Sequence, residues 1–284
     1  MSKATELRAL LSGDRMVRTV GARDGLSAKL VQEAGFDAVW ASSFETSATH
    51  GLPDASLLTM TQFLDVAEAM NLVVDLPIVA DCDTGFGGPL NVAYAVQRYE
   101  KRGIAAMSIE DKMFPKMNSF AATAQHLVST EEFVQKIQAG KQAQESGDLL
   151  LIARTEALIA GFDLDEALRR AHAYADAGAD AILVHSKSRN PDQVLGFGAR
   201  WDRDVPLVAV PTTYPVVSEK DLYEVGYRLV IYANHGMRAA IKGMRATLAD
   251  LARSDSAAGL EDSLASMAEV FALQNMPAAF QELA

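Results

Sequence analysis

Three carboxylates follow two apolar segments of the chain in a pattern that suits a metal ion. Asp81 and Asp83 come directly after the apolar residues 77–80, and Glu110 comes directly after residues 105–109. Alternate residues of a strand point the same way, and neighbouring strands lie about 4.8 Å apart, so the three side chains can meet if the first strand continues to Asp83. Grouped carboxylates repel one another unless a cation lies among them, and oxygen-only ligation suits Mg²⁺. Each acid alone could equally be a helix cap or a solvated loop residue.

A guanidinium, an imidazole and a serine pair follow other apolar segments. Arg154 comes after residues 149–153 and His185 after residues 180–184. An arginine binds carboxylate or phosphoryl oxygens as a fork. A lone histidine is most often a packed core residue, but the position of His185 beside Arg154 and opposite three acids favours a role in function. Ser42-Ser43-Phe44 also follows a strand, and its backbone N–H groups could form an anion-binding nest or a simple turn.

The segment from Asp111 to Ser119 differs from the other loops. It is long and basic, with Lys112 and Lys116, and flexible sequence follows it through Gln125. A lid that closes over an anion has this composition. The alternative is a plain surface loop.

A repeated pattern predicts the elements that must position these residues. Four times, a helix ends at a glycine and a short apolar strand begins one or two residues later, after Gly35, Gly103, Gly178 and Gly226. Glycine commonly ends a helix, and continuous apolar runs are typical of strands buried on both faces. With the other apolar runs, the first of them weak, this gives eight strands centred near residues 17, 38, 79, 107, 151, 182, 208 and 230. Amphipathic helices such as residues 164–175 lie between them.

Eight strand–helix units in about 250 residues predict an α/β fold, a (β/α)₈ TIM barrel whose chemistry lies at the C-terminal ends of the strands. The alternative, a doubly wound open sheet, would need a G-x-G-x-x-G loop after the first strand, and residues 21–25 do not supply it. Two more helices are expected, near residues 237–253 and 260–274. The prediction is a single barrel domain over residues 1–284, with residues 255–284 as a C-terminal helical extension.

The composition limits the partners of the 284-residue chain. Its formal charge of −11 does not attract nucleic acid or an anionic membrane, so local cations or a metal must hold any anionic substrate. The single cysteine, Cys82, excludes an internal disulfide and a cysteine-based zinc site. No apolar run approaches the roughly 20 residues of a membrane span, and residues 1–11 lack a signal-peptide core. We expect a cytoplasmic enzyme that acts on a small anionic substrate, with no nucleic-acid or membrane partner.

Several of these motifs resemble the phosphoenolpyruvate mutase/isocitrate lyase superfamily, in particular its mutase and hydrolase branch. The similarity extends from Gly25 to His235 and rests on four motifs: Asp81-Cys82-Asp83-Thr84-Gly85-Phe86-Gly87, Glu110-Asp111-Lys112 followed by Pro115-Lys116 and Asn118-Ser119, Arg154-Thr155-Glu156-Ala157, and His185-Ser186-Lys187. The resemblance implies a TIM barrel, a Mg²⁺ cofactor, phosphoenolpyruvate or phosphonopyruvate as substrate, and a homo-oligomer, either a tetramer or a dimer.

The resemblance also implies three groups of site residues. The first holds Mg²⁺, with Asp81 as the primary ligand and its waters held by Asp83, Glu110 and Asp54. The second binds the pyruvyl carboxylate and comprises Ser42, Ser43 and Phe44. The third surrounds the phosphoryl group that moves and comprises Asp54, Lys116, Asn118, Ser119, Arg154 and His185, with Trp40 lining the pocket.

The same motifs bear on the reaction. The lid with Asn118 resembles a mutase, which interconverts phosphoenolpyruvate and phosphonopyruvate. The Phe44-Glu45 pair and residues 52–55 and 210–215 resemble phosphonopyruvate hydrolase, which yields pyruvate and phosphate. We favour the mutase and keep the hydrolase as the alternative. The lyases of the superfamily carry a catalytic cysteine in the lid, and this lid has none, so C–C bond cleavage of the isocitrate or methylisocitrate lyase type is disfavoured.

Overall fold

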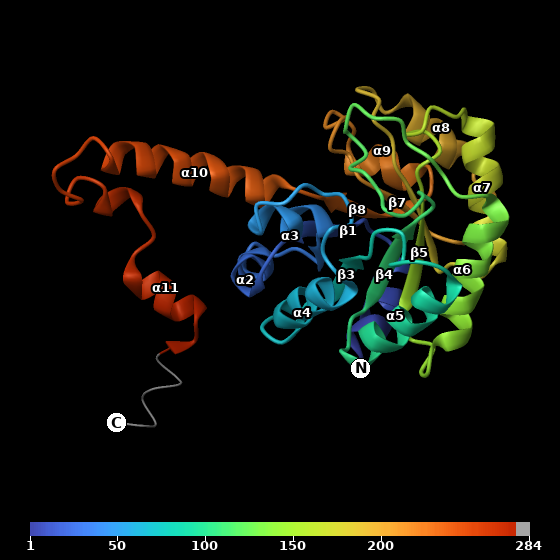
Figure 1. The fold of residues 1–284 in the computed structure, drawn as a ribbon, viewed down its shortest axis with the longest axis horizontal. Helices are drawn as coiled ribbons and strands as arrows, with labels where there is room; N and C mark the ends of the chain where they lie inside the picture. Colours follow the sequence, from blue (N-terminus) through green and yellow to red (C-terminus); the bar gives the residue numbers. More distant parts are fainter. Residues whose placement is uncertain (277–284) are drawn as a thin grey trace. The chain divides into compact units, whose positions relative to one another are not determined.

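The computed structural model of the chain describes residues 1–276, and its first unit is a closed barrel of eight parallel strands (Figure 1). The strands are β1 (Val17–Ala22), β2 (Ala38–Ala41), β3 (Ile78–Asp81), β4 (Ala106–Glu110), β5 (Leu150–Thr155), β6 (Ala181–Val184), β7 (Leu207–Ala209) and β8 (Tyr227–Tyr232). Each strand pairs with the next, and β8 closes the barrel against β1 through the register Val17↔Leu229. All eight predicted strands and the predicted TIM barrel are confirmed, and the open-sheet alternative is excluded.

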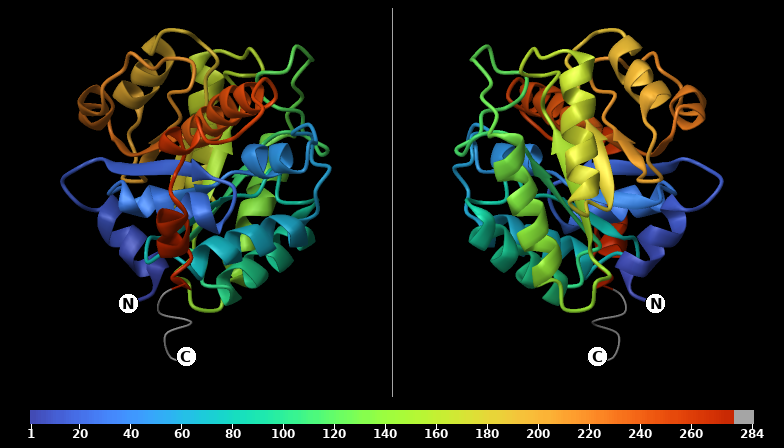
Figure 2. Two further views of the ribbon diagram at one scale, coloured as in Figure 1. Left: turned by 90° about the vertical axis from the view of Figure 1, so that its left-hand side faces the viewer. Right: turned by 90° about the vertical axis from the view of Figure 1, so that its right-hand side faces the viewer.

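Helices form an outer layer around these strands (Figure 2). They are α1 (Lys3–Leu11), α2 (Gly25–Glu33), α3 (Ser43–Thr49), α4 (Met60–Asn71), α5 (Pro89–Lys101), α6 (Thr130–Ala143), α7 (Leu164–Asp176), α8 (Asp192–Arg200) and α9 (Glu219–Glu224). Local sequence starts and stops them: Asp24 caps α2 by accepting from the N–H of Ser27, and Gly178 follows α7 with a φ of 101°. The predicted helix over residues 164–175 is confirmed as α7, which buries Ala167, Leu168 and Ala171.

Two apolar layers hold the barrel together. The inner layer fills the barrel with side chains such as Val17, Trp40, Ile152, Leu183 and Leu229, and the outer layer lies between the strands and the helices. Because strands buried on both faces leave no room inside the barrel, polar side chains can gather only where the strands end.

The chain divides into two compact units, residues 1–234 and residues 235–284. In the described part of the second unit, α10 (His235–Leu251) is followed by a short 3₁₀ helix (Glu261–Ser263) and α11 (Met267–Leu273). The predicted helix over residues 260–274 is therefore wrong in its first half. Ser266 accepts a hydrogen bond from the N–H of Glu269 and begins the helix late, at Met267.

The predicted extension over residues 255–284 falls in the second unit, and its last eight residues lie outside the described part of the chain. The prediction of a single domain remains a prediction. Over residues 1–276, none of the helices combines the length and the apolar character needed to cross a membrane.

Candidate active site

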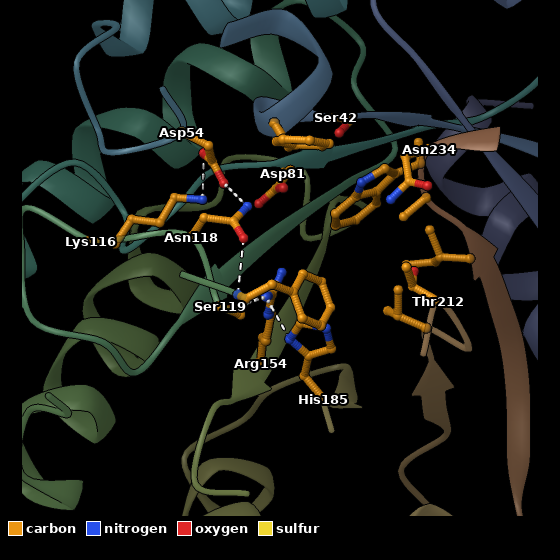
Figure 3. Close-up of a pocket in the computed structure, with 16 residues that line it drawn as sticks. Ser42, Asp54, Asp81, Lys116, Asn118, Ser119, Arg154, His185, Thr212 and Asn234 are labelled. Atoms are coloured by element: carbon orange, nitrogen blue, oxygen red, sulfur yellow. Dashed lines mark hydrogen bonds and ion pairs between the residues drawn. The ribbon is translucent and has the colours of Figure 1, made fainter. Parts of the chain in front are cut away.

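A pocket of about 250 Å³ opens where the strands of the barrel end (Figure 3). The predicted site residues that line it are Trp40, Ser42, Phe44, Asp54, Asp81, Lys116, Asn118, Ser119, Arg154 and His185. The predicted residues Ser43, Asp83 and Glu110 do not line the pocket. They are buried, and each contacts a residue that does: Asp81, Lys116 and Arg154 respectively. The barrel therefore brings together predicted site residues that lie up to 145 positions apart in the sequence, from Trp40 to His185.

Asp81 and Asp83 reach this region by different routes. Asp81 is the last residue of β3, and its Oδ2 accepts a hydrogen bond from Ser43 Oγ at 2.8 Å. The strand does not continue to Asp83, which has a φ of 48°, so the predicted strand alternation is wrong. The turn directs the Asp83 carboxylate to Ser56 Oγ at 3.0 Å and to Lys116 Nζ at 3.1 Å instead. Asp83 thus belongs to the site through the lid lysine.

Glu110 is the last residue of β4 and lies in register with Arg154 of β5. Its Oε2 lies 3.2 Å from Arg154 Nε, and its Oε1 lies 3.8 Å from Lys112 Nζ. Within the described residues neither oxygen accepts a hydrogen bond. Burial raises the pKa of Glu110 to about 7, against the attraction of Arg154 and Lys112.

The acids of the site fit a cation that keeps most of its water. Over residues 1–276, no group of three or more His, Cys, Asp or Glu side chains is arranged to hold a metal ion directly, so the predicted trio does not form one closed ligand cluster. The donors near the pocket are nevertheless carboxylate oxygens, and Glu110 has both of its oxygens buried without a hydrogen bond. Mg²⁺ prefers this chemistry, because it binds through one or two carboxylates and retains several waters. Of the four acids, Asp54 and Asp81 line the pocket.

Opposite these acids, Arg154 and His185 share a buried carboxylate. Glu156 Oε1 accepts from Arg154 Nε at 2.6 Å and lies 2.7 Å from His185 Nδ1. Burial alone would raise the pKa of Glu156, but Arg154 and His185 outweigh it and hold that pKa well below its usual range. Burial lowers the pKa of His185, and Glu156 offsets this only in part. Glu156 was assigned no role from the sequence, although it directly follows β5 and lies two residues after Arg154, which was the available signal.

The segment after β4 folds over the pocket and is not a plain surface loop. Lys116 is buried, and its Nζ lies 2.8 Å from Asp54 Oδ1. Asn118 Nδ2 donates to Asp54 Oδ2 at 2.8 Å. Figure 3 marks this hydrogen bond with a dashed line. The N–H of Val128 donates to the carbonyl of Asp111 and the N–H of Met113 donates to the carbonyl of His126, which closes the base of the loop. Burial would lower the pKa of Lys116, but Asp83 and Asp54 raise it well above its usual value, so the lysine is a permanent cation.

The serine segment is neither a nest nor a simple turn but the start of a short helix. Ser42 caps α3, and its Oγ accepts from the N–H of Glu45 at 3.2 Å. The N–H groups of a first helical turn have no acceptor within the helix and can face an anion. Ser42 and Phe44 of this turn line the pocket.

The remaining wall consists of residues that were assigned no specific role from the sequence. It comprises Phe120, Val210, Thr212, Ile231, Ala233 and Asn234. Thr212 and Asn234 lie within three residues of the ends of β7 and β8, and a polar residue just after a strand was a usable signal. The apolar members carry no such signal, because an apolar residue at a strand end is indistinguishable in sequence from a core residue.

Known proteins resemble this chain over most of its length. The family described as "Phosphoenolpyruvate phosphomutase" matches residues 7–252. Phosphonopyruvate hydrolase of Variovorax sp. (strain Pal2) is 44% identical over 96% of this chain and 95% of that protein. The solved structure of phosphoenolpyruvate phosphomutase from Streptomyces platensis subsp. rosaceus superposes with a TM-score of 0.96 at 50% identity, over 98% of this chain and 97% of that one.

Two further comparisons bear on the cofactor and on the reaction. A phosphonopyruvate hydrolase solved in complex with oxalate and Mg²⁺ superposes with a TM-score of 0.93 at 42% identity, over 99% of both chains. The 2,3-dimethylmalate lyase of Eubacterium barkeri is more distant, at 34% identity over 95% of this chain and 93% of that protein.

Proposed function

The chain belongs to the phosphoenolpyruvate mutase family, and on that premise we propose that it is a phosphoenolpyruvate mutase, which interconverts phosphoenolpyruvate and phosphonopyruvate. The observation that carries the proposal is the closed lid. Its residues Lys116, Asn118 and Ser119 line the pocket and are held there by buried carboxylates. A phosphoryl group that leaves one atom of the substrate and rejoins another must be kept from water, and a lid closed in this way does that.

The proposed reaction is a shift of one bond within the substrate. The P–O bond of phosphoenolpyruvate breaks, and its electron pair stays on oxygen as the pyruvate enolate. The C3 carbon of the enolate then bonds to phosphorus, the C–O bond becomes a ketone, and no proton is gained or lost. Such a transfer is loose and the moving fragment resembles metaphosphate, so the protein has to stabilise charge and prevent escape.

The residues of this chain divide that work. Ser42, Ser43 and Phe44 at the start of α3 would bind the pyruvyl carboxylate, and Trp40 would pack beside it. Arg154 lines the pocket between the acids and His185, so it would bridge carboxylate and phosphoryl oxygens. His185, Lys116, Asn118 and Ser119 would surround the phosphoryl group. Asp54 would hold the lid closed through Lys116 and Asn118 beside that group.

Mg²⁺ is proposed as the cofactor. Asp81 would be its ligand, and Asp54, Asp83 and Glu110 would bind its waters. Bound there, the ion would supply Lewis-acid stabilisation of negative charge on the substrate oxygens. Lys116 and Arg154 would balance the acids that remain.

Phosphonopyruvate hydrolase is the second candidate, and the 44% identity to the Variovorax enzyme favours it. Hydrolysis uses the same groups but delivers the phosphoryl group to water, so the difference lies in whether the closed lid admits a water molecule. C–C bond cleavage is less well supported, because the single cysteine, Cys82, is buried after β3 and does not lie in the lid.

In the test, the protein is mixed with phosphonopyruvate and Mg²⁺, and the phosphorus-containing products are followed by ³¹P NMR. A mutase yields phosphoenolpyruvate, and omission of the metal stops the reaction. Inorganic phosphate as the first product would replace the mutase proposal with the hydrolase. No change in the spectrum would refute both.

We also propose that the protein is a homo-oligomer, a tetramer or a dimer. The support is the apolar side chains of α10 that are exposed in the single chain, Ile241, Met244, Leu248 and Leu251. Light scattering coupled to gel filtration measures the subunit count, and a monomer at micromolar concentration would contradict the proposal. The cytoplasmic location remains a prediction from the sequence.

A further inference from the structure

We infer that Glu156 is a positioning residue that fixes the orientation of Arg154 and His185 and couples both to the closed lid. Glu156 is fully buried and is not among the residues that line the pocket. The inference rests on the proposed function for the roles of Arg154 and His185, but its central observation is independent of which reaction they serve.

The two oxygens of Glu156 bind two different parts of the protein. Oε1 faces the barrel wall, with Arg154 Nε at 2.6 Å and His185 Nδ1 at 2.7 Å. Oε2 faces the lid, with Ser119 Oγ at 2.6 Å and Lys112 Nζ at 3.1 Å. One carboxylate therefore joins the ends of β5 and β6 to the loop that closes over them.

This arrangement selects the tautomer of His185. Its Nδ1 lies 2.7 Å from Glu156 Oε1 and 2.8 Å from Arg154 Nη2, and one ring nitrogen cannot donate to the first and accept from the second. The carboxylate is ionised and can only accept, so the proton belongs on Nδ1. Arg154 Nη2 keeps Ser119 Oγ as an acceptor at 3.1 Å.

The consequence for the pocket concerns the other ring nitrogen. With its proton on Nδ1, a neutral His185 carries a lone pair on Nε2, the nitrogen left for the pocket that this residue lines. Nε2 can then accept a proton when a phosphoryl group binds, and Glu156 stabilises the imidazolium that results. The opposite tautomer would place the lone pair of Nδ1 against the carboxylate.

The lid oxygen gives Glu156 a second effect. Ser119 Oγ donates to Oε2 and accepts from Lys112 Nζ at 2.7 Å, and Lys112 Nζ also donates to the carbonyl of Met117 at 2.9 Å. Opening the lid removes Ser119 from Oε2 and leaves a buried carboxylate with fewer donors, which is costly. The closed lid and the histidine tautomer thus depend on the same carboxylate.

Glu156→Gln separates this role from simple packing. The amide keeps the shape of the carboxylate, but its nitrogen is a donor, so the pair of partners that faces the nitrogen loses its acceptor. Glu156→Asp keeps the charge and shortens the reach. The matched control is Asp180→Asn at the opposite end of the barrel, where a mostly buried carboxylate accepts from Lys141 Nζ at 2.8 Å and from the N–H of Leu151 at 2.8 Å.

The first measurement uses ¹⁵N-histidine NMR of the full-length protein without substrate, with the His185 signals assigned through His185→Asn. We expect the Nδ1–H tautomer in the wild-type protein and in Asp180→Asn, and a shift of the equilibrium toward Nε2–H in Glu156→Gln. An Nε2–H ring in the wild-type protein, or an unaltered tautomer in a folded Glu156→Gln variant, would overturn the inference. If Glu156→Gln does not fold, the wild-type and Glu156→Asp spectra decide.

The second measurement is turnover of phosphonopyruvate. We expect Glu156→Gln to lower kcat about 10- to 100-fold with partial recovery in Glu156→Asp, as for other partners that orient active-site groups. Asp180→Asn should retain the wild-type kcat. Equal losses in Glu156→Gln and Asp180→Asn would reduce Glu156 to a structural residue. A wild-type protein that does not turn over this substrate would refute the proposed function and leave the tautomer measurement valid.

Discussion

The two ends of the barrel differ in how their buried carboxylates are hydrogen-bonded. At the N-terminal end of β6, Asp180 binds Lys141, Arg8 and a backbone N–H, and 13% of its side chain remains exposed to water. At the C-terminal ends of the strands, Glu45 and Glu110 are almost completely buried, and within the described residues their oxygens accept no hydrogen bond. Asp180 thus has donors for its carboxylate, whereas Glu45 and Glu110 at the other end have, in the described part of the chain, no hydrogen-bond donors for theirs. Perturbed charges of this kind gather at functional sites, where they cost stability and serve binding.

The largest effect is expected from removing the proposed Mg²⁺ ligand at the C-terminal ends of the strands. Asp81→Ala removes the proposed Mg²⁺ ligand, so kcat/KM should fall on the order of 10³-fold or more, because a metal ion contributes several kcal/mol of charge stabilisation. The fold should persist, since the carboxylate is buried against its own preference and burial raises its pKa. Steady-state assays at saturating Mg²⁺, with circular dichroism as the control, measure both. Full activity in the variant would refute the metal role.

The next prediction concerns the pH dependence of stability. Burial raises the pKa of Glu45 from its ordinary 4.5 to about 7, although Arg23 nearby lowers it and Asp24 raises it slightly. The folded state therefore holds this proton more tightly than the unfolded state, so stability falls as the pH rises from 4.5 to 7. The loss is on the order of 3 kcal/mol, at 1.36 kcal/mol per pKa unit.

Glu45→Gln should abolish that contribution. Urea unfolding at pH 5 and pH 8 should show a smaller decrease in the free energy of unfolding for the variant than for the wild-type protein. Identical pH dependence in the two proteins would show that the burial of Glu45 carries no such cost.

A smaller effect tests the lid. Asn118→Ala removes the hydrogen bond to Asp54 Oδ2 and leaves that carboxylate with Lys116 alone on the lid side. A hydrogen bond to a charged group contributes about 1.5–3 kcal/mol, so turnover to phosphoenolpyruvate should fall roughly 10- to 100-fold. ³¹P NMR should also detect more inorganic phosphate. An unchanged rate and product ratio would count against the lid assignment.

The smallest effect lies at the other end of the barrel. Asp180→Asn keeps an acceptor for the N–H of Leu151 and loses partly exposed ion pairs with Arg8 and Lys141. The free energy of unfolding should decrease by about 1 kcal/mol, and kcat/KM should be unchanged. Denaturant titration and the activity assay check the two statements. A large loss of activity in Asp180→Asn would contradict the statement that only the C-terminal end of the barrel serves catalysis.

Much of the fold could be read from the sequence because its signals are local. A buried parallel strand needs a continuous apolar run, and a helix before it needs a stop such as Gly178, so the eight strands were predictable. The site residues at strand ends, such as Arg154 and His185, were predictable for the same reason. The late start of α11 was missed, although Ser266 and Glu269 form the capping box that begins it.

The sequence by itself determined the barrel, the end of it that holds the chemistry and the types of side chain gathered there, because strand periodicity and helix stops act over a few residues. Only the tertiary structure decided where those side chains point. Asp83 reaches Lys116 through a left-handed turn, and Glu156 meets Ser119 and His185 from 37 and 29 positions away. Such contacts depend on how distant segments pack, and no local pattern along the chain records that.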